Sequence, residues 1–251
     1  MKRIVLSIIV ILIYSATYAI DNAKLFSEAN NAYKKSEYNT AITLYHSILK
    51  EGVESADVYF NLGNAYYKQK DIANAILYYE RAHKLNPSDD EINFNLQLAQ
   101  TMIVDKINVL PEFIVFKWWR NFSELISSDS WAWTSIFTFI FALLAILLYL
   151  FVRIKWLKVC SFWFAVVFLF FSLTSFIHSY QIKSFNEAHT SAIVMSASVT
   201  LKSSPVDNGT DLFVLHEGSK VIILDSVGEW IKIKIADGNN GWLKKSDIEE
   251  I

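Results

Sequence analysis

Apolar residues occur in several patterns along this chain, and the clearest pattern is a long run without charged side chains. Residues 131–152 and 159–177 contain no charged side chain over 22 and 19 positions. At 1.5 Å per residue, a helix of the first length is about 33 Å long, enough for a bilayer core of roughly 30 Å. The pattern predicts two transmembrane helices over these ranges. A pair of buried core helices is the alternative.

The short segment between these runs, residues 153–158, carries Arg153, Lys155 and Lys158 and no acidic residue. Short basic loops stay in the cytoplasm. We therefore expect a helical hairpin with a cytoplasmic tip, and with the regions before and after it outside the cytoplasm. Lys117 and Arg120 lie on the expected outer side and weigh against this orientation.

The N-terminus is an apolar stretch of another kind. Lys2 and Arg3 precede an apolar core from Ile4 to Ile13, and the small residue Ala19 ends a segment suited to signal peptidase. This order predicts a secretory signal peptide over residues 1–19. An uncleaved anchor is the alternative, and either one exports the domain that follows.

The first hundred residues combine helical spacing with a 34-residue period. The clearest copy has the residue types of the tetratricopeptide pattern at Tyr59, Leu62, Gly63, Tyr66, Ala75, Tyr79, Ala82 and Pro87. We expect an all-α tetratricopeptide repeat domain over residues 22–104, with repeats at 22–55 and 56–89 and a partial third at 90–104. Gly63 and Ala75 should lie where the two helices of a repeat approach closely. About three such units are needed for stability, so something should cover the exposed end.

The region over residues 105–130 mixes aromatic and apolar side chains with isolated charges. It is typical of an amphipathic, interfacial linker that lies at the membrane surface. The alternative is that residues 107–126 pack on the last repeat as its cap.

After Ser179 the pattern alternates. Ile231, Ile233 and Ile235 face one way and the intervening lysines face the other, as in a half-buried antiparallel strand. Residues 190–251 resemble the bacterial SH3-like domain, a small all-β barrel. The resemblance rests on the Trp230 strand and on the pair Gly241 and Trp242, which we expect to have a structural or binding role.

No catalytic arrangement is visible in the sequence. The five histidines are scattered without metal-ligand spacing, Cys160 lies inside a predicted span, and there is no glycine-rich phosphate loop. A net charge of −2 gives no indication of nucleic-acid binding. We expect a multidomain membrane protein that is not an enzyme and has no metal or cofactor.

The repeats suggest recognition of a polypeptide instead. In tetratricopeptide arrays the first helix of each repeat lines a concave groove, and amide side chains there can both donate to and accept from a peptide backbone. The residues expected to form this groove are Asn30, Phe60, Asn61, Asn64, Tyr67, Lys68 and Asn95. The alternative is that these asparagines only satisfy neighbouring helices.

The order of signal peptide, repeats, two-span hairpin and SH3-like domain resembles the BatE proteins of the Bacteroides aerotolerance operon. The resemblance implies a protein of the bacterial inner membrane with both soluble domains in the periplasm. It also implies partners, namely membrane-anchored von Willebrand factor A-domain proteins and a MoxR-type ATPase, in oxidative or envelope stress tolerance. Two functions remain open: an interaction scaffold, and a peptidoglycan-binding or wall-sensing protein acting through the SH3-like domain.

Overall fold

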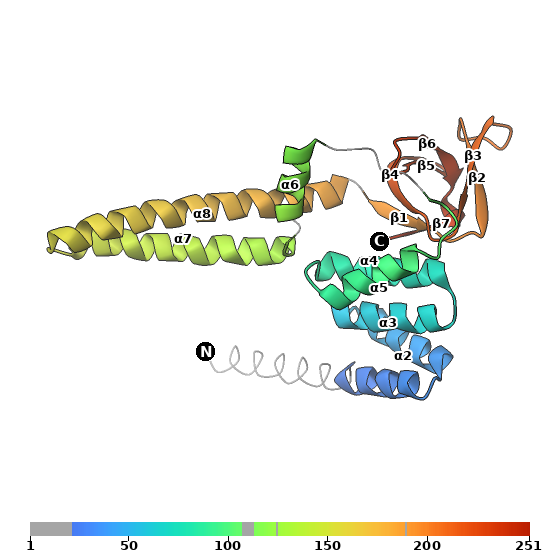
Figure 1. The fold of residues 1–251 in the computed structure, drawn as a ribbon, viewed down its shortest axis with the longest axis horizontal. Coiled ribbons are helices and arrows are strands. Elements are labelled where there is room, and N and C mark those ends of the chain that lie inside the picture. Colours follow the sequence, from blue (N-terminus) through green and yellow to red (C-terminus); the bar gives the residue numbers. More distant parts are fainter. Residues whose placement is uncertain (1–21, 107–112, 124, 189) are drawn as a thin grey trace, which may run out of the picture.

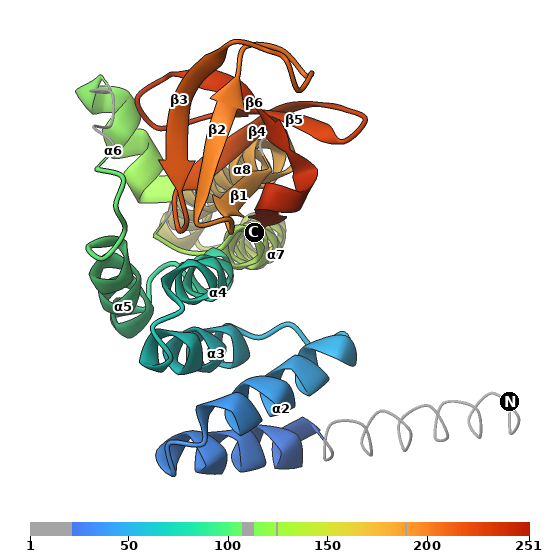
Figure 2. The ribbon, with the colours of Figure 1, turned by 90° about the vertical axis from the view of Figure 1, so that its right-hand side faces the viewer.

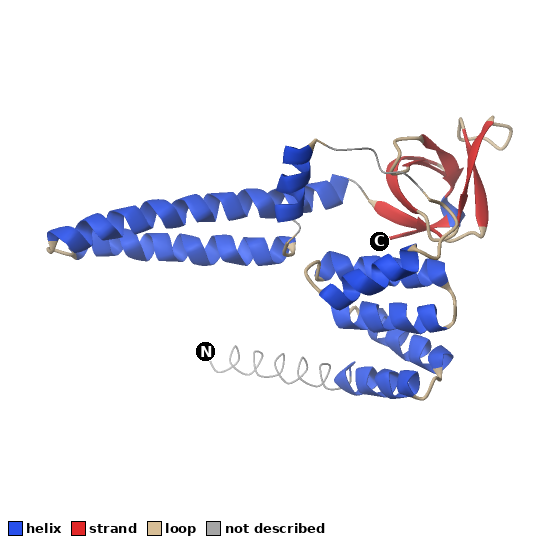
Figure 3. Ribbon diagram, viewed as in Figure 1, coloured by secondary structure: helices blue, strands red, loops and turns tan. Residues whose placement is uncertain are grey.

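The computed structural model describes residues 22–106, 113–123, 125–188 and 190–251. A long helical hairpin extends from one side of the molecule, while a stack of short helices and a small barrel lie together at its base (Figure 1). The described chain is helical up to Ala188, and its strands follow from Ser191 onward (Figure 3). This is the fold class predicted from the sequence. The expected signal peptide over residues 1–19 lies outside the described residues and stays a prediction.

Five helices form the repeat region. A first helix is described over residues 22–34, and it is followed by α2 (Tyr38–Lys50), α3 (Ala56–Lys68), α4 (Ile72–Leu85) and α5 (Asp90–Gln100). Side-chain caps begin two of them: Asp71 accepts a hydrogen bond from the Asn74 N–H, and Asp89 accepts from the Glu91 and Ile92 N–H groups. The last helix ends at Gln100, earlier than the expected limit of about Val104, because the chain turns there towards the barrel.

Gly63 lies at the close approach of α3 and α4, as the repeat pattern predicts. A Cβ added at Gly63 would stand 2.7 Å from two ring carbons of Tyr79 and 3.3 Å from the Ala75 carbonyl oxygen. Both distances are shorter than ordinary van der Waals contact. Glycine at this position therefore sets the spacing between the two helices.

Among the described residues, two helices are long and apolar enough to cross a membrane: α7 (Ser128–Phe151) and α8 (Lys155–Ala188). Only 17% and 22% of their most apolar segments are buried, unlike the core helices of a soluble protein. α7 begins three residues before the first predicted run and ends at Phe151, one residue before the end of that run, whereas α8 extends beyond the second run at both ends. The expected loop at 153–158 is consequently shorter, because α8 begins at Lys155.

Small residues bring the two helices of the hairpin together. The Ser135 hydroxyl donates to the Ser172 carbonyl oxygen at 2.9 Å, and the Ser172 hydroxyl donates to the Ser135 carbonyl oxygen at 3.0 Å. Ala142 and Ala165 are buried one heptad away from these serines. Such close, hydrogen-bonded contacts replace the hydrophobic effect between helices surrounded by lipid.

The segment expected to be interfacial contains α6 (Ile114–Ser123). Its described contacts lie on the hairpin: Ser123 and His178 are joined by a 2.7 Å hydrogen bond, and the Trp119 ring lies 4.5 Å from that of His178. The described part of α6 thus packs on α8, which favours the membrane-surface interpretation. The alternative, that residues 107–126 form a cap on the repeats, lies partly outside the described residues and stays untested.

The C-terminal region is a seven-stranded antiparallel sheet in the order β3-β2-β6-β5-β4-β1-β7. Its strands are β1 (Ser191–Val194), β2 (Ser198–Lys202), β3 (Asp211–His216), β4 (Lys220–Val227), β5 (Trp230–Lys234), β6 (Asn240–Lys244) and β7 (Ile248–Glu250). Ile231 and Ile233 are buried on one side of β5, which confirms the predicted alternation.

The barrel covers the exposed end of the repeats. Figure 2 shows the helices stacked below it, with α4 nearest. Ile193 belongs to the hydrophobic core of the repeats, and Met195 and Ile251 pack against that core. The barrel therefore supplies the apolar surface that the second helix of a third repeat would otherwise provide.

Candidate functional site

Two hydrogen-bonded ladders cross the helices that line the expected groove. In the first, the Tyr45 hydroxyl donates to Asn30 Oδ1 at 2.6 Å, and Asn61 Nδ2 donates to the same oxygen at 3.3 Å. In the second, one period later, Tyr79 donates to Asn64 Oδ1 at 2.7 Å and Asn95 Nδ2 donates to it at 3.0 Å. The 34-residue repeat is thus a repeat of side-chain bonding as well as of helix packing.

The tyrosines fix the orientation of the amides. Burial raises the pKa of Tyr45 to about 12, and it raises the pKa of Tyr79 further, so both hydroxyls keep their protons. Each can therefore serve as a permanent donor to the asparagine oxygen. Because the Oδ1 atoms of Asn30 and Asn64 accept the tyrosine bonds, the Nδ2 groups of these residues point away from the tyrosines. Asn61 and Asn95 donate through Nδ2, so their Oδ1 atoms take no part in these bonds.

The other amide atom of each asparagine takes no part in these bonds, and the four residues are half-buried. Within the described residues none of these four atoms has a hydrogen-bond partner, and none is a fully buried unsatisfied atom. Two donors and two acceptors are thus presented at a repeating interval. The alternative considered from the sequence holds for the oxygens of Asn30 and Asn64, which do satisfy neighbouring helices.

The other predicted groove residues differ in exposure. Phe60 and Tyr67 are half-buried against the repeat core, and Lys68 is exposed at the end of α3. Phe94, one period after Phe60, is 65% exposed, and the described chain has no second helix of a third repeat to cover it as Tyr79 of α4 covers Phe60. The last repeat therefore presents an aromatic side chain beside the second ladder.

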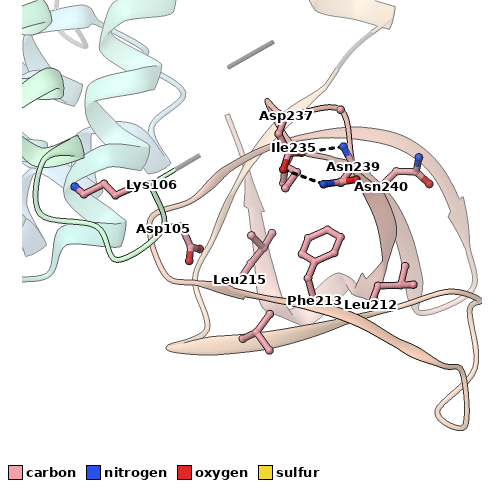
Figure 4. A pocket seen from close by; sticks show the side chains of 11 residues that line it. Asp105, Lys106, Leu212, Phe213, Leu215, Ile235, Asp237, Asn239 and Asn240 are labelled. Atoms are coloured by element: carbon pink, nitrogen blue, oxygen red, sulfur yellow. Dashed lines mark hydrogen bonds between the residues drawn. The ribbon is translucent and has the colours of Figure 1, made fainter. Parts of the chain in front are cut away.

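A second candidate site lies on the barrel and was not anticipated from the sequence. A cavity of about 840 Å³ has an apolar wall that includes Phe213, Leu215 and Ile235. Its rim carries polar side chains of the β5–β6 turn, with Asn239 donating to Asp237 (Figure 4). The lining comes from segments far apart in the sequence, so no spacing could have indicated it.

The SH3-like residues chosen from the sequence do not line this cavity. Gly241 lies against Leu201, where an added Cβ would stand 3.0 Å from the Leu201 Cβ. Trp230 and Trp242 are half-buried, and Lys244 Nζ lies 5.5 Å from the centre of the Trp230 ring. Packing against Leu201 gives Gly241 a place in the barrel core, while the role expected for Trp230 and Trp242 stays a prediction.

A cluster centred on Asp105 joins the end of the repeats to the β3–β4 turn. The Asp105 carboxylate accepts hydrogen bonds from the His216 N–H at 2.7 Å and from the Ser219 hydroxyl at 2.6 Å, and His216 Nδ1 lies 2.8 Å away. Burial acts to raise the pKa of Asp105, but the bonds from Ser219 and His216 outweigh it, and the pKa lies below 3.8. The charged carboxylate therefore holds the two domains together.

This pKa shift predicts a loss of stability in acid. The contribution of Asp105 is complete above its ordinary pKa of 3.8 and disappears as the pH falls through the lower, folded-state value. Asp105→Asn should lower the free energy that stabilises the docked barrel by about 1–3 kcal/mol at pH 7. It should also reduce the acid sensitivity of barrel docking, measured by hydrogen exchange of β4 between pH 6 and pH 2. Glu80 and Glu249 also form ion pairs at this interface, so the difference between wild type and variant isolates Asp105. An unchanged pH dependence would contradict the assignment.

Groups typical of catalysis or metal binding do not gather elsewhere in the described chain. No set of three or more His, Cys, Asp or Glu side chains in the described residues is placed to hold a metal ion. His46, in α2, lies 2.9 Å from the Tyr66 hydroxyl, and burial lowers its pKa. It is a packing residue, as expected from the sequence.

Comparison with known families agrees with this division of the chain. Residues 56–89 match the tetratricopeptide repeat, and residues 197–249 match the bacterial SH3 domain. No curated protein matches the chain. Both matched domain types are typically non-catalytic, and the first is associated with binding other proteins. The chain therefore joins a tetratricopeptide repeat region and a bacterial SH3 domain to two helices of membrane-spanning length.

Proposed function

We propose that this protein is a membrane-anchored, non-enzymatic scaffold that binds a segment of a partner protein along the concave side of its repeats. The observation that carries the proposal is the pair of tyrosine–asparagine ladders. Each ladder orients its amides through hydrogen bonds and leaves one donor and one acceptor without a partner among the described residues.

An extended polypeptide is the ligand that suits this surface. Its backbone presents alternating N–H and C=O groups, and fixed amides bind them without first losing side-chain freedom. Phe94 and Leu98 are exposed one helical turn apart on α5 and offer an apolar contact beside Asn95. A segment with backbone bonds to the ladders and an apolar side chain against Phe94 would use all of these groups.

The proposed setting is the bacterial inner membrane, with the repeats and the barrel in the periplasm. The basic tip of the hairpin at Arg153, Lys155 and Lys158 supports this orientation. By resemblance to BatE proteins, the proposed partners are membrane-anchored von Willebrand factor A-domain proteins that work with a MoxR-type ATPase. The same resemblance suggests a role in oxidative or envelope stress tolerance.

The test begins with capture of the partner. Phe94 is the best attachment point for an aromatic photocrosslinker, because it is already aromatic and 65% exposed. Crosslinking in intact cells, followed by mass spectrometry, should yield one membrane-anchored protein. Adducts with abundant proteins only, from a protein that is folded and inserted, would contradict a specific groove.

The captured partner then allows a mutational test. Asn61→Ala with Asn95→Ala should weaken binding at least tenfold by removing two open acceptors. The double variant should stay folded, because Tyr45 and Tyr79 still satisfy the oxygens of Asn30 and Asn64. Asn64→Ala is a poorer choice, since it leaves the buried Tyr79 hydroxyl without an acceptor at a cost of about 1–3 kcal/mol. Exposed Asn31 gives the matched control, Asn31→Ala, with unchanged affinity expected. Unchanged affinity of the folded double variant would show that the ladders do not bind the partner.

Cell-wall binding is the second candidate, supported by the match to the bacterial SH3 domain and by the cavity beside β3. The full-length protein should be tested, because the barrel packs on the repeats. Retention on purified peptidoglycan, lost when Phe213 is replaced by alanine in a folded protein, would favour the wall-binding function. Absence of retention would leave the scaffold as the better proposal.

A further inference from the structure

The two edge strands of the barrel sheet, β7 and β3, differ in what lies beside them. β7 pairs with β1 and lies against the repeats, where Arg81 of α4 donates to the Glu250 carbonyl oxygen and forms an ion pair with Glu249. β3 pairs with β2 on one side. Among the strands of the described chain, none lies beside the other edge of β3.

The pairing of β3 fixes the direction of its backbone groups. In an antiparallel pair every second residue bonds to the neighbouring strand, and the backbone groups of the residues between point to the opposite edge. The His216 N–H donates to the Asp105 carboxylate at 2.7 Å, so it points away from β2. Val214 lies two residues earlier, and the register against β2 shifts only beyond Phe213. The N–H and C=O of Val214 therefore also point away from β2.

Asp105 stands where a neighbouring strand would begin. Its carboxylate accepts the His216 N–H, as the carbonyl oxygen of a paired strand would do. Among the described backbone hydrogen bonds outside the strand ladders, none involves Val214, and this residue is 47% exposed. Edge strands are commonly protected by lysine or proline, and Asp211–His216 contains neither. The edge is thus covered at His216 and open at Val214.

The cavity of about 840 Å³ borders this open edge. Residues Leu212 to Leu215 of β3 form one side, and the β5–β6 turn forms the other (Figure 4). Phe213 packs with Leu215 and Ile235 in the barrel core, whereas Leu212 and Val214 are each 47% exposed. Since successive side chains of a strand point to opposite faces, a strand added here would have an apolar inner face and a solvated outer face.

The open edge suits one kind of occupant. An N–H and a C=O that point the same way from a strand edge are complementary to the backbone of an extended polypeptide. A second copy of β3 does not fit, because pairing about Val214 would bring Leu212 of one copy beside His216 of the other. Asp105 already lies there. A short segment that ends before Asp105 meets no such obstacle.

We propose that β3 and this cavity bind a short extended segment of a partner protein. The segment pairs with the N–H and C=O of Val214 and places an apolar side chain against Phe213 and Ile235. It thereby adds a strand to the barrel sheet. This surface is a second docking site of the proposed scaffold, and it does not depend on the asparagine ladders of the repeats.

Short peptides selected from a random library on phage, with the full-length protein in nanodiscs as target, are the probe. Val214→Pro should weaken the selected peptides roughly tenfold, because it removes the N–H and leaves a buried peptide carbonyl without a donor. The barrel should stay folded, since proline is tolerated on an edge strand where the N–H faces outward. Val214→Thr is the matched control: it keeps the N–H and the shape of the side chain, and affinity close to that of the wild type is expected.

Hydrogen exchange supplies a second measurement, in which bound peptide should slow the exchange of β3 in the wild type. It decides alone if Val214→Pro does not fold. Unslowed exchange would overturn the proposal, as would a selection that yields only peptides with equal affinity for wild type and folded Val214→Pro. Purified peptidoglycan that displaces the peptides and binds both proteins equally would assign the cavity to the wall and overturn it too. Asn61→Ala with Asn95→Ala should leave these peptides bound, so failure here is distinguishable from failure of the repeat groove.

Discussion

Replacing Lys220 with methionine should destabilise the docking of the barrel on the repeats by about 2–3 kcal/mol. Glu80 is 5% exposed on α4, and its carboxylate lies 2.7 Å from Lys220 Nζ. Removing one partner of a buried ion pair costs about 3–5 kcal/mol, because the other charge is left without compensation. The expected loss is smaller here, since 46% of the Lys220 side chain is exposed. Hydrogen exchange of α4 and β4 in the full-length protein measures the effect.

Two further variants make this prediction specific. Lys244 has the same side-chain exposure of 46%, but it pairs with Asp207, which is 78% exposed. Lys244→Met should therefore leave exchange nearly unchanged, since surface pairs contribute little. Adding Glu80→Leu to Lys220→Met should recover most of the lost stability, because it removes the uncompensated charge. Failure of this rescue would mean that Lys220 acts through its own packing rather than through Glu80.

Replacing Gly218 with alanine should destabilise the same interface by about 2–5 kcal/mol, from two separate costs. Gly218 has a φ of +83°, where a side chain costs roughly 1–2 kcal/mol. An added Cβ would also stand 2.6 Å from Ile103 Cγ2 and 3.3 Å from Ile76 Cδ1, and such overpacking costs about 1–3 kcal/mol. The β3–β4 turn would have to withdraw from the repeats.

Gly228 separates these two costs. Its φ is +61°, yet an added Cβ would have no atom within 4 Å. Gly228→Ala should therefore cost only the free energy of placing a side chain at a positive φ. It should leave the amides of α4 and α5 protected from hydrogen exchange. Equal effects of the two substitutions would show that the contact with Ile103 and Ile76 is unimportant for docking.

Both predictions concern one structural consequence of a short repeat array. The described repeat region ends after the first helix of a third repeat, so the outer face of α4 has no repeat helix to cover it. The barrel contributes Ile193 to that core, and Arg81 of α4 donates to the Glu250 carbonyl oxygen of β7. The repeat region and the SH3 domain are therefore packed against each other through apolar contacts and hydrogen bonds.

The classes of structure in this protein follow from local patterns in its sequence. The 34-residue period places Gly63 against Tyr79, two uncharged runs predict the hairpin, and the alternation of Ile231 and Ile233 predicts the β5 strand. Each of these patterns describes how neighbouring residues share a helix face, a membrane or a strand. Such information is contained in short stretches of chain and is read without knowing the fold.

Only the tertiary structure decides how these parts meet. The bonds from Glu80 to Lys220 and from Asp105 to His216 join residues more than a hundred positions apart, at distances unrelated to any period. The sequence indicated that the repeats need a cover, but the one candidate that it offered was residues 107–126, as the alternative to an interfacial linker. It likewise placed Asn30, Asn61, Asn64 and Asn95 in the groove without showing which of their atoms are already bonded. The docking of the barrel and the orientation of the amides depend on how distant surfaces fit together in space. The spacing of residues along the sequence does not contain this information.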